Sequence, residues 1–153
     1  MIHLSAQTWD AICRHATETF PEECCGVILV DNGNETVRQI TNMQNAMHAK
    51  DPQQFPRDAT IAYFMEPKEL LAVMNEVDRG RAGLKAFYHS HPDHDAYFSA
   101  EDKRQAMFGD DPSYPDTVYL VISIYSRQVR TIKAYQWDET AKDFIETELQ
   151  TSV

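Results

Sequence analysis

The chain has 153 residues, of which 42% are hydrophobic, and this size and composition suit a globular fold with its own core. Its 24 acidic and 14 basic residues give a formal net charge of −10, the wrong sign for binding the phosphates of nucleic acids or an anionic lipid surface. No apolar run approaches the roughly 20 residues that cross a bilayer, so we expect neither a nucleic-acid nor a membrane partner.

The first part of the chain predicts one helix followed by a β-hairpin. Apolar residues recur at helical spacing from Ser5 to Phe20, with Ser5 as the N-cap and Leu4 placed to pack against Trp9. A short apolar run at 24–30 then predicts a buried strand. The sequence at 31–34 is typical of a tight turn, which leads into a second predicted strand at 36–41.

The middle of the chain predicts a long loop, a helix and a strand. Residues 42–60 have no clear period and include two prolines, so we expect a long surface loop that borders a substrate groove. A second helix is expected to begin at Pro67 and to stop at Gly80. The strand predicted at 84–91 ends at Pro92, because proline has no N–H to donate to a neighbouring strand.

The last third of the chain predicts a further helix and several strands. The helix opens at Ser99 and is expected to run to about Gly109. Residues typical of strands follow at 117–124, 128–136 and, as a short last element, 143–148. Strands interleaved with about three helices predict an α/β or α+β sandwich, in which a curved mixed sheet is flanked by helices.

The sequence contains no sign of a second unit. No linker, repeat or low-complexity tract interrupts it, so we expect a single domain spanning residues 1–153. The first ten residues show no basic start followed by an apolar stretch, and three cysteines cannot make a fully paired disulfide framework. We therefore expect a cytoplasmic protein.

Four polar residues around the end of the 84–91 strand have the spacing of a metal site. His89 and His91 are two residues apart on a strand, so both imidazoles point to the same face. Ser99 and Asp102 open the next helix, close enough for the carboxylate to fold back over the strand end. Two histidines and one carboxylate suit Zn²⁺, and three protein ligands leave a fourth position for water, as is typical of catalytic zinc.

The same residues resemble the signature of the JAMM metalloproteases, also called the MPN+ or JAB family. The resemblance consists of His-Ser-His-Pro at 89–92 followed by Ser99-x-x-Asp102. Members of this family also use a glutamate three residues before a glycine at the start of a buried strand. The segment 21–26 resembles this pattern and selects Glu23 as the glutamate.

The resemblance covers nearly the whole chain and implies a small prokaryotic-type member with the JAB/MPN, cytidine-deaminase-like architecture. It implies that His89, His91 and Asp102 hold Zn²⁺, that Glu23 is the general base and that Ser99 stabilises the oxyanion. The implied reaction is hydrolysis of a peptide or isopeptide bond by a zinc-activated water. The implied substrate is the C-terminal tail of a ubiquitin-like or sulfur-carrier protein.

Several alternatives remain open at this point. Ser99-x-x-Asp102 is also similar to a helix capping box, a role compatible with metal binding, and Glu22 competes with Glu23 by one register. Phe98 stands where many family members have proline, so the resemblance does not determine the shape of the loop before Ser99 or its substrate contacts. The chain could also be a non-catalytic MPN-type protein-binding scaffold, although such scaffolds usually lack the ligand residues.

Overall fold

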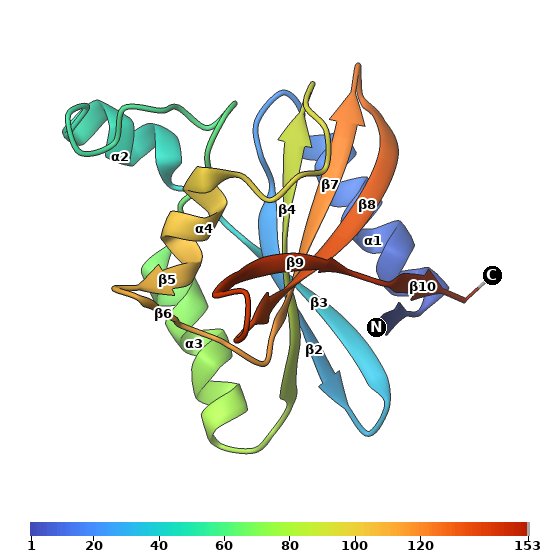
Figure 1. Cartoon of the computed structure of the whole chain (residues 1–153). Helices are drawn as coiled ribbons and strands as arrows, with labels where there is room; N and C mark the ends of the chain where they lie inside the picture. Colours follow the sequence, from blue (N-terminus) through green and yellow to red (C-terminus); the bar gives the residue numbers. More distant parts are fainter. Residues whose placement is uncertain (153) are drawn as a thin grey trace.

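A six-stranded mixed sheet lies at the centre of the computed structural model, which describes residues 1–152 (Figure 1). The strand order is β3-β2-β4-β7-β8-β9, and only the β4–β7 pair is parallel. The bounds of these six strands are β2 Cys25–Asp31, β3 Asn34–Ile40, β4 Gly83–Pro92, β7 Val118–Tyr125, β8 Gln128–Asp138 and β9 Asp143–Thr147. The curved mixed sheet with flanking helices confirms the predicted fold class.

Helices cover both faces of this sheet (Figure 1). Their bounds are α1 Ala6–Thr19, α2 Gln44–Lys50, α3 Pro67–Asp78 and α4 Ala100–Ala106. The two faces follow from the alternation of side chains along each strand. Ile28 and Tyr88 belong to the apolar cluster that includes residues of α1, whereas Val27 and Phe87 belong to the cluster that includes residues of α3 and α4. The long apolar runs of β2, β4 and β7 therefore reflect burial on both sides.

Several local predictions are confirmed. The Ser5 hydroxyl oxygen accepts a hydrogen bond from the Thr8 amide, which makes Ser5 the N-cap of α1. Asn32 and Gly33 both have positive φ, +48° and +81°, as the tight turn of the β2–β3 hairpin requires. Pro67 is the first residue of α3, and Gly80 follows its end with a φ of +71°.

Other predictions need correction. Residues 42–60 are not entirely loop, because α2 forms within them. The helix that begins after Ser99 ends at Ala106. A small hairpin of two-residue strands follows it and turns at Gly109, which has a positive φ. The residues described therefore contain four helices, one more than expected.

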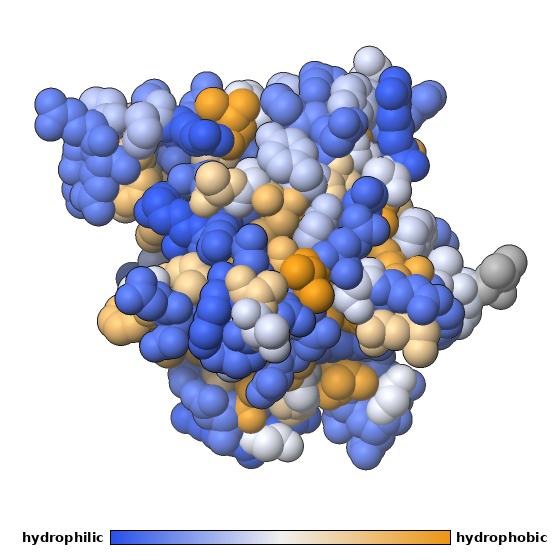
Figure 2. All heavy atoms as spheres, in the orientation of Figure 1, coloured by the Kyte–Doolittle hydropathy of each residue, from blue (hydrophilic) through white to orange (hydrophobic). Residues whose placement is uncertain are grey.

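Short strands that the sequence did not predict complete the structure. Near the chain ends, β1 pairs in parallel with β10, and after α4 the strand β5 pairs with β6. Their bounds are β1 Ile2–Leu4, β5 Met107–Phe108, β6 Asp111–Pro112 and β10 Leu149–Thr151. None of the helices in residues 1–152 is long and apolar enough to cross a membrane. The face shown in Figure 2 is mostly hydrophilic, with hydrophobic residues in small scattered groups.

Candidate metal centre

Hydrogen bonds from Ser90 hold the end of β4 against the segment that precedes β2. Ser90 lies between the two histidines of β4, so its side chain points to the opposite face of the sheet. Its hydroxyl oxygen accepts the Cys24 amide at 2.8 Å, and its own amide donates to the Cys24 carbonyl at 3.1 Å. Cys24 is thereby fixed beside β4, and the preceding residue, Glu23, lies next to the histidines.

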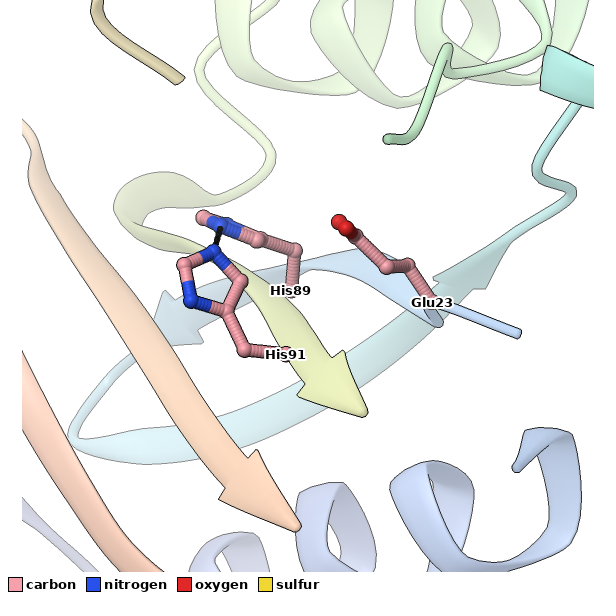
Figure 3. Close-up of side chains that lie close together, drawn as sticks. All are labelled: Glu23, His89 and His91. Carbon is pink, nitrogen blue, oxygen red and sulfur yellow. Dashed lines mark hydrogen bonds between the residues drawn. The ribbon is translucent and has the colours of Figure 1, made fainter. Parts of the chain in front are cut away.

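Three side chains converge at distances that suit a metal ion. The Nε2 atoms of His89 and His91 are 3.2 Å apart (Figure 3). The two carboxylate oxygens of Asp102 each lie 3.1 Å from one of these nitrogens. Nitrogen and oxygen atoms bound to one tetrahedral Zn²⁺ are separated by about 3.3 Å, since each lies about 2.0–2.1 Å from the ion. The fold thus brings together His89, His91 and Asp102, the three side chains predicted from the sequence to meet at the end of this strand.

The orientation of His91 also fits a cation at this point. Its Nδ1 lies 2.8 Å from the carbonyl oxygen of Asp95. A carbonyl only accepts, so Nδ1 carries the proton of the neutral ring and Nε2 presents a lone pair. In that neutral form Nε2 and a carboxylate oxygen of Asp102, 3.1 Å away, both offer lone pairs to the same point. The His89 ring is fixed by stacking on Tyr63, with ring centroids 4.6 Å apart. The histidine nitrogens and the Asp102 carboxylate together form a set of donors that fits a positive ion.

Asp102 is held by a capping box at the start of α4. The Asp102 amide donates to the Ser99 hydroxyl oxygen at 3.0 Å, and the Ser99 amide donates to an Asp102 carboxylate oxygen at 2.9 Å. Asp102 therefore takes part in the helix cap and also contacts the histidines, because the cap fixes its carboxylate beside the two imidazoles.

Glu23 contributes a buried carboxylate with a free oxygen. The residue is 4% exposed, and its Oε1 has no hydrogen-bond partner among residues 1–152. A carboxylate oxygen of Glu23 and the nitrogens of both histidines lie within 4.8 Å of one another (Figure 3). Burial without a partner is costly for a carboxylate, so this oxygen marks a place where water or a cation is needed.

The backbone of Glu23 is fixed from two sides. Its amide donates to the Ala59 carbonyl at 2.7 Å, and its carbonyl accepts the Asn42 side-chain amide at 2.9 Å. The neighbouring Glu22 instead accepts a hydrogen bond from Asn45 at 2.9 Å, outside the cluster. The geometry therefore brings Glu23, and not Glu22, to the histidines.

The buried charges shift one another's pKa values. Burial raises the pKa of Glu23, the Asp102 carboxylate raises it further, and Arg57 opposes both. Burial also acts to raise the pKa of Asp102, but His89 and His91 outweigh it and hold that pKa well below its usual range. Burial lowers the pKa of His89, against the pull of Asp102. Neutral histidine is the form that binds metals, and a cation held here would lower the pKa of Glu23 again.

A pocket of about 320 Å³ opens beside this cluster. Two chain segments supply most of its wall, one from the 42–66 connection and one from the loop after β4. The lining residues are Glu23, Arg57, Ile61, His91, His94, Tyr97 and Ser99. Ile61 and Tyr97 are exposed apolar side chains, so the pocket mouth combines apolar and charged groups.

Phe98, which replaces the proline of many family members, anchors the loop after β4. Its ring packs against those of Phe144, Tyr119 and Tyr135, with centroids 4.8, 5.4 and 5.5 Å away. The Tyr135 hydroxyl also donates to the Ala96 carbonyl at 2.6 Å. Aromatic packing thus restrains the backbone immediately before Ser99, where proline would restrict it covalently.

Comparison with known proteins agrees with this geometry. Residues 5–138 match the family described as prokaryotic homologs of the JAB domain. The chain belongs to this family. A desampylase from Haloferax volcanii is 30% identical over 140 residues, which cover 89% of this chain and 87% of that protein. This JAB-family chain is therefore a hydrolase of the JAMM type, as the sequence predicted.

Solved structures share the fold of this JAB-family chain. A protein from Desulfitobacterium hafniense has a TM-score of 0.71 and 23% identity, covering 99% of this chain and 93% of its own. A protein from Salinibacter ruber has a TM-score of 0.61 and 20% identity, covering 99% and 92%. A JAB1/MPN domain protein from Archaeoglobus fulgidus has a TM-score of 0.54 and 14% identity, and covers both chains completely.

Sequence reasoning missed three residues that shape the site. Asn42 bonds through its side chain to Glu23, Ala62, Gln44 and Phe64, and so ties the loop to the glutamate. Tyr63 supports the ring of His89, and Arg57 lines the pocket. All three lie in or near the connection between β3 and α3, whose sequence has no periodic pattern from which their positions could be inferred.

Proposed function

We propose that this protein is a Zn²⁺-dependent peptidase or isopeptidase acting on the C-terminal tail of a ubiquitin-like or sulfur-carrier protein. The observation that carries the proposal is the buried, partnerless Oε1 of Glu23 beside two histidines. The similarity to a desampylase supports a ubiquitin-like modifier as the substrate. The sulfur-carrier alternative rests on the small size of the chain and its family resemblance.

In this proposal His89, His91 and Asp102 hold the metal. Their nitrogens and oxygens already lie 3.1–3.2 Å apart, and imidazole nitrogens and carboxylate oxygens are the donor atoms that suit Zn²⁺. When bound, Zn²⁺ supplies Lewis-acid polarisation of a carbonyl and lowers the pKa of a water molecule from 15.7 to about 7. Three protein ligands suit this catalytic use, since a structural zinc is usually held by four.

Glu23 moves the proton. Its free oxygen accepts a proton from the attacking water, whose oxygen bonds to the carbonyl carbon of the substrate. The C–N bond then breaks, and the proton passes from Glu23 to the leaving nitrogen. A raised pKa brings a buried carboxylate closer to the neutral range in which it can both accept and return a proton.

Ser99 stabilises the negative charge that develops on the carbonyl oxygen. Its hydroxyl oxygen is occupied by the amide of Asp102, which leaves the hydroxyl proton free to donate into the pocket. Removal of one such donor typically lowers the rate about 10²–10³-fold.

The test separates metal binding from proton transfer. Glu23→Gln should retain a zinc content near that of the wild type and lose about 10²–10⁴-fold in hydrolysis of carrier-protein conjugates. Glu22→Gln is the matched control, because Glu22 bonds to Asn45 outside the cluster, and it should stay active. If Glu23→Gln keeps both its metal and full activity, the assignment of the base is wrong.

A wild-type chain that binds zinc but cleaves no conjugate would favour the alternative of a non-catalytic MPN-type scaffold.

We also propose a single domain spanning 1–153 in a cytoplasmic setting. The cytoplasmic assignment is supported by free Cys13, Cys24 and Cys25, since a reducing compartment keeps thiols unpaired.

A further inference from the structure

Arg57 is an arginine in the wall of the catalytic pocket. It lies in the segment after α2 and lines the same space as Glu23, His91 and Ser99. Its side chain is exposed on this wall of the pocket. The protein as a whole carries a net charge of −10, so acidic side chains outnumber basic ones.

Within residues 1–152 the guanidinium of Arg57 forms no ion pair with a carboxylate, although its charge acts to lower the pKa values of Glu23 and Glu101. Its one hydrogen bond there is a long one, 3.4 Å from Nη1 to the carbonyl oxygen of Ile61. The carboxylate of the adjacent Asp58 accepts instead from the amide and hydroxyl of Thr60. Six other cationic side chains form ion pairs with carboxylates of the chain: Arg38, Lys85, Lys103, Arg104, Lys133 and Lys142.

The backbone that carries Arg57 is held in place by α2. The buried side chain of Gln44 donates to the Arg57 carbonyl at 2.8 Å, and Asn45 accepts the amide of Ala59 at 2.8 Å. Ala59 in turn accepts the amide of Glu23. The backbones of Arg57 and of the glutamate are therefore held relative to one another through a short chain of hydrogen bonds, and the Arg57 side chain extends from this anchored backbone along the wall of the pocket.

We propose that Arg57 binds the α-carboxylate of the residue released by hydrolysis, so that the preferred substrate is a linear tail carrying one extra C-terminal residue. Guanidinium and carboxylate form paired, charge-assisted hydrogen bonds. The released residue follows the scissile bond directly, so its carboxylate falls within a pocket of about 320 Å³. An isopeptide-linked lysine within a folded protein presents no free carboxylate there. The inference rests on the proposed peptidase function.

The experiment compares two tail peptides that differ only at their end. Both carry one residue after the scissile bond, as a free acid in one and as a carboxamide in the other. The wild type should cleave the acid about 10- to 100-fold faster in kcat/KM, the effect expected of a hydrogen-bonded charge pair. Arg57→Gln should bring the ratio of acid to amide cleavage close to one, whatever its effect on the rate with the amide. Arg57→Lys should recover part of the preference.

Two controls separate this inference from the peptidase proposal. Arg14→Gln makes the same charge change on an exposed face of α1 and should preserve the preference for the acid. Binding of both peptides to Glu23→Gln, measured by calorimetry, reports the carboxylate contact without turnover, and the acid should bind about 10-fold more tightly.

The outcomes are distinguishable. Equal cleavage and equal binding of acid and amide by the wild-type pocket would overturn the role of Arg57 and leave the peptidase function standing. Tighter binding of the acid, lost in Arg57→Gln, with no cleavage of either peptide would support the carboxylate contact and count against the peptidase. A stronger rate on an isopeptide conjugate than on the acid would also overturn the inference.

Discussion

At the scale of single residues, Gly26 explains why the Glu-x-x-Gly pattern needs its glycine. A Cβ atom at this position would lie 2.5 Å from three atoms of the Tyr88 side chain. The Tyr88 hydroxyl is hydrogen-bonded to Nδ1 of buried His15 at 2.7 Å, so the ring has little freedom to move away. Gly26→Ala should therefore lower the free energy of unfolding by about 1–3 kcal/mol, as measured by urea denaturation.

A second glycine gives the control for this prediction. A Cβ atom at Gly83 would lie 3.3 Å from a methyl group of Val30, a contact that a small side-chain shift relieves. Gly83→Ala should change the free energy of unfolding by less than Gly26→Ala. Equal losses in the two variants would show that the closeness of Tyr88 does not determine the cost.

The residues of the site divide into those that local spacing predicts and those that it does not. The period of two on a strand places His89 and His91 on one face, and helix-capping chemistry places Asp102 in the first turn of the next helix. These relations depend on neighbours in sequence. Asn42 and Arg57 reach the site through hydrogen bonds between segments that have no regular period, so their positions depend on the complete tertiary fold.

At the scale of elements, the start of α4 combines a helix cap with the proposed catalytic hydroxyl of Ser99. The Ser5 hydroxyl caps α1 in the same way, by accepting an amide three residues on. Ser99→Ala and Ser5→Ala should each cost about 1 kcal/mol of stability or slightly more, by loss of the cap. Only Ser99→Ala should also lose about 10²–10³-fold in kcat, since only Ser99 faces the catalytic pocket.

Thermal unfolding and steady-state rates of both variants check this prediction. Comparable activity of Ser99→Ala and Ser5→Ala would limit Ser99 to a capping role. Loss of the metal in Ser99→Ala would instead show that the cap acts by holding the Asp102 carboxylate, a possibility that zinc content measures directly.

The elements that sequence patterns failed to predict are those stabilised mainly by contacts with distant segments. The short helix α2 begins after Met43, which makes no side-chain cap, and is joined to the following loop by bonds from Gln44 and His48. Helices of this length have little stability of their own. The chain-end strands β1 and β10 have three residues each, too few for a period of two to be recognised.

At the scale of the whole molecule, the site joins parts of the chain that are far apart in sequence. Glu23 precedes β2, the histidines end β4, and Asp102 lies in α4. Continuous apolar runs in β2, β4 and β7 indicate strands buried on both faces, but the parallel pairing of β4 with β7 depends on the crossover through α4 that separates them. The proposed metal ligands come from the end of β4 and from α4 within that crossover connection, so metal binding and the tertiary fold should be thermodynamically linked.

This linkage gives a prediction for the stability of the entire chain. A ligand that binds only the native state at 100 times its Kd adds about 2.7 kcal/mol to the free energy of unfolding. For a protein of this size each kcal/mol corresponds to about 2–4 °C in Tm. Zn²⁺ at that concentration should therefore raise Tm by about 5–10 °C, and a chelator should reverse the rise, as followed by scanning fluorimetry.

The comparison of two histidine variants assigns that rise to the site. His89→Ala removes a nitrogen that lies 3.1 Å from Asp102 and should abolish the zinc-dependent increase in Tm, whatever its own Tm without metal. His3→Ala changes an exposed histidine on β1, away from the cluster, and should keep the full increase. An unchanged increase in His89→Ala would mean that the stabilising ion binds elsewhere, because a ligand shifts the unfolding equilibrium only through contacts made in the native state.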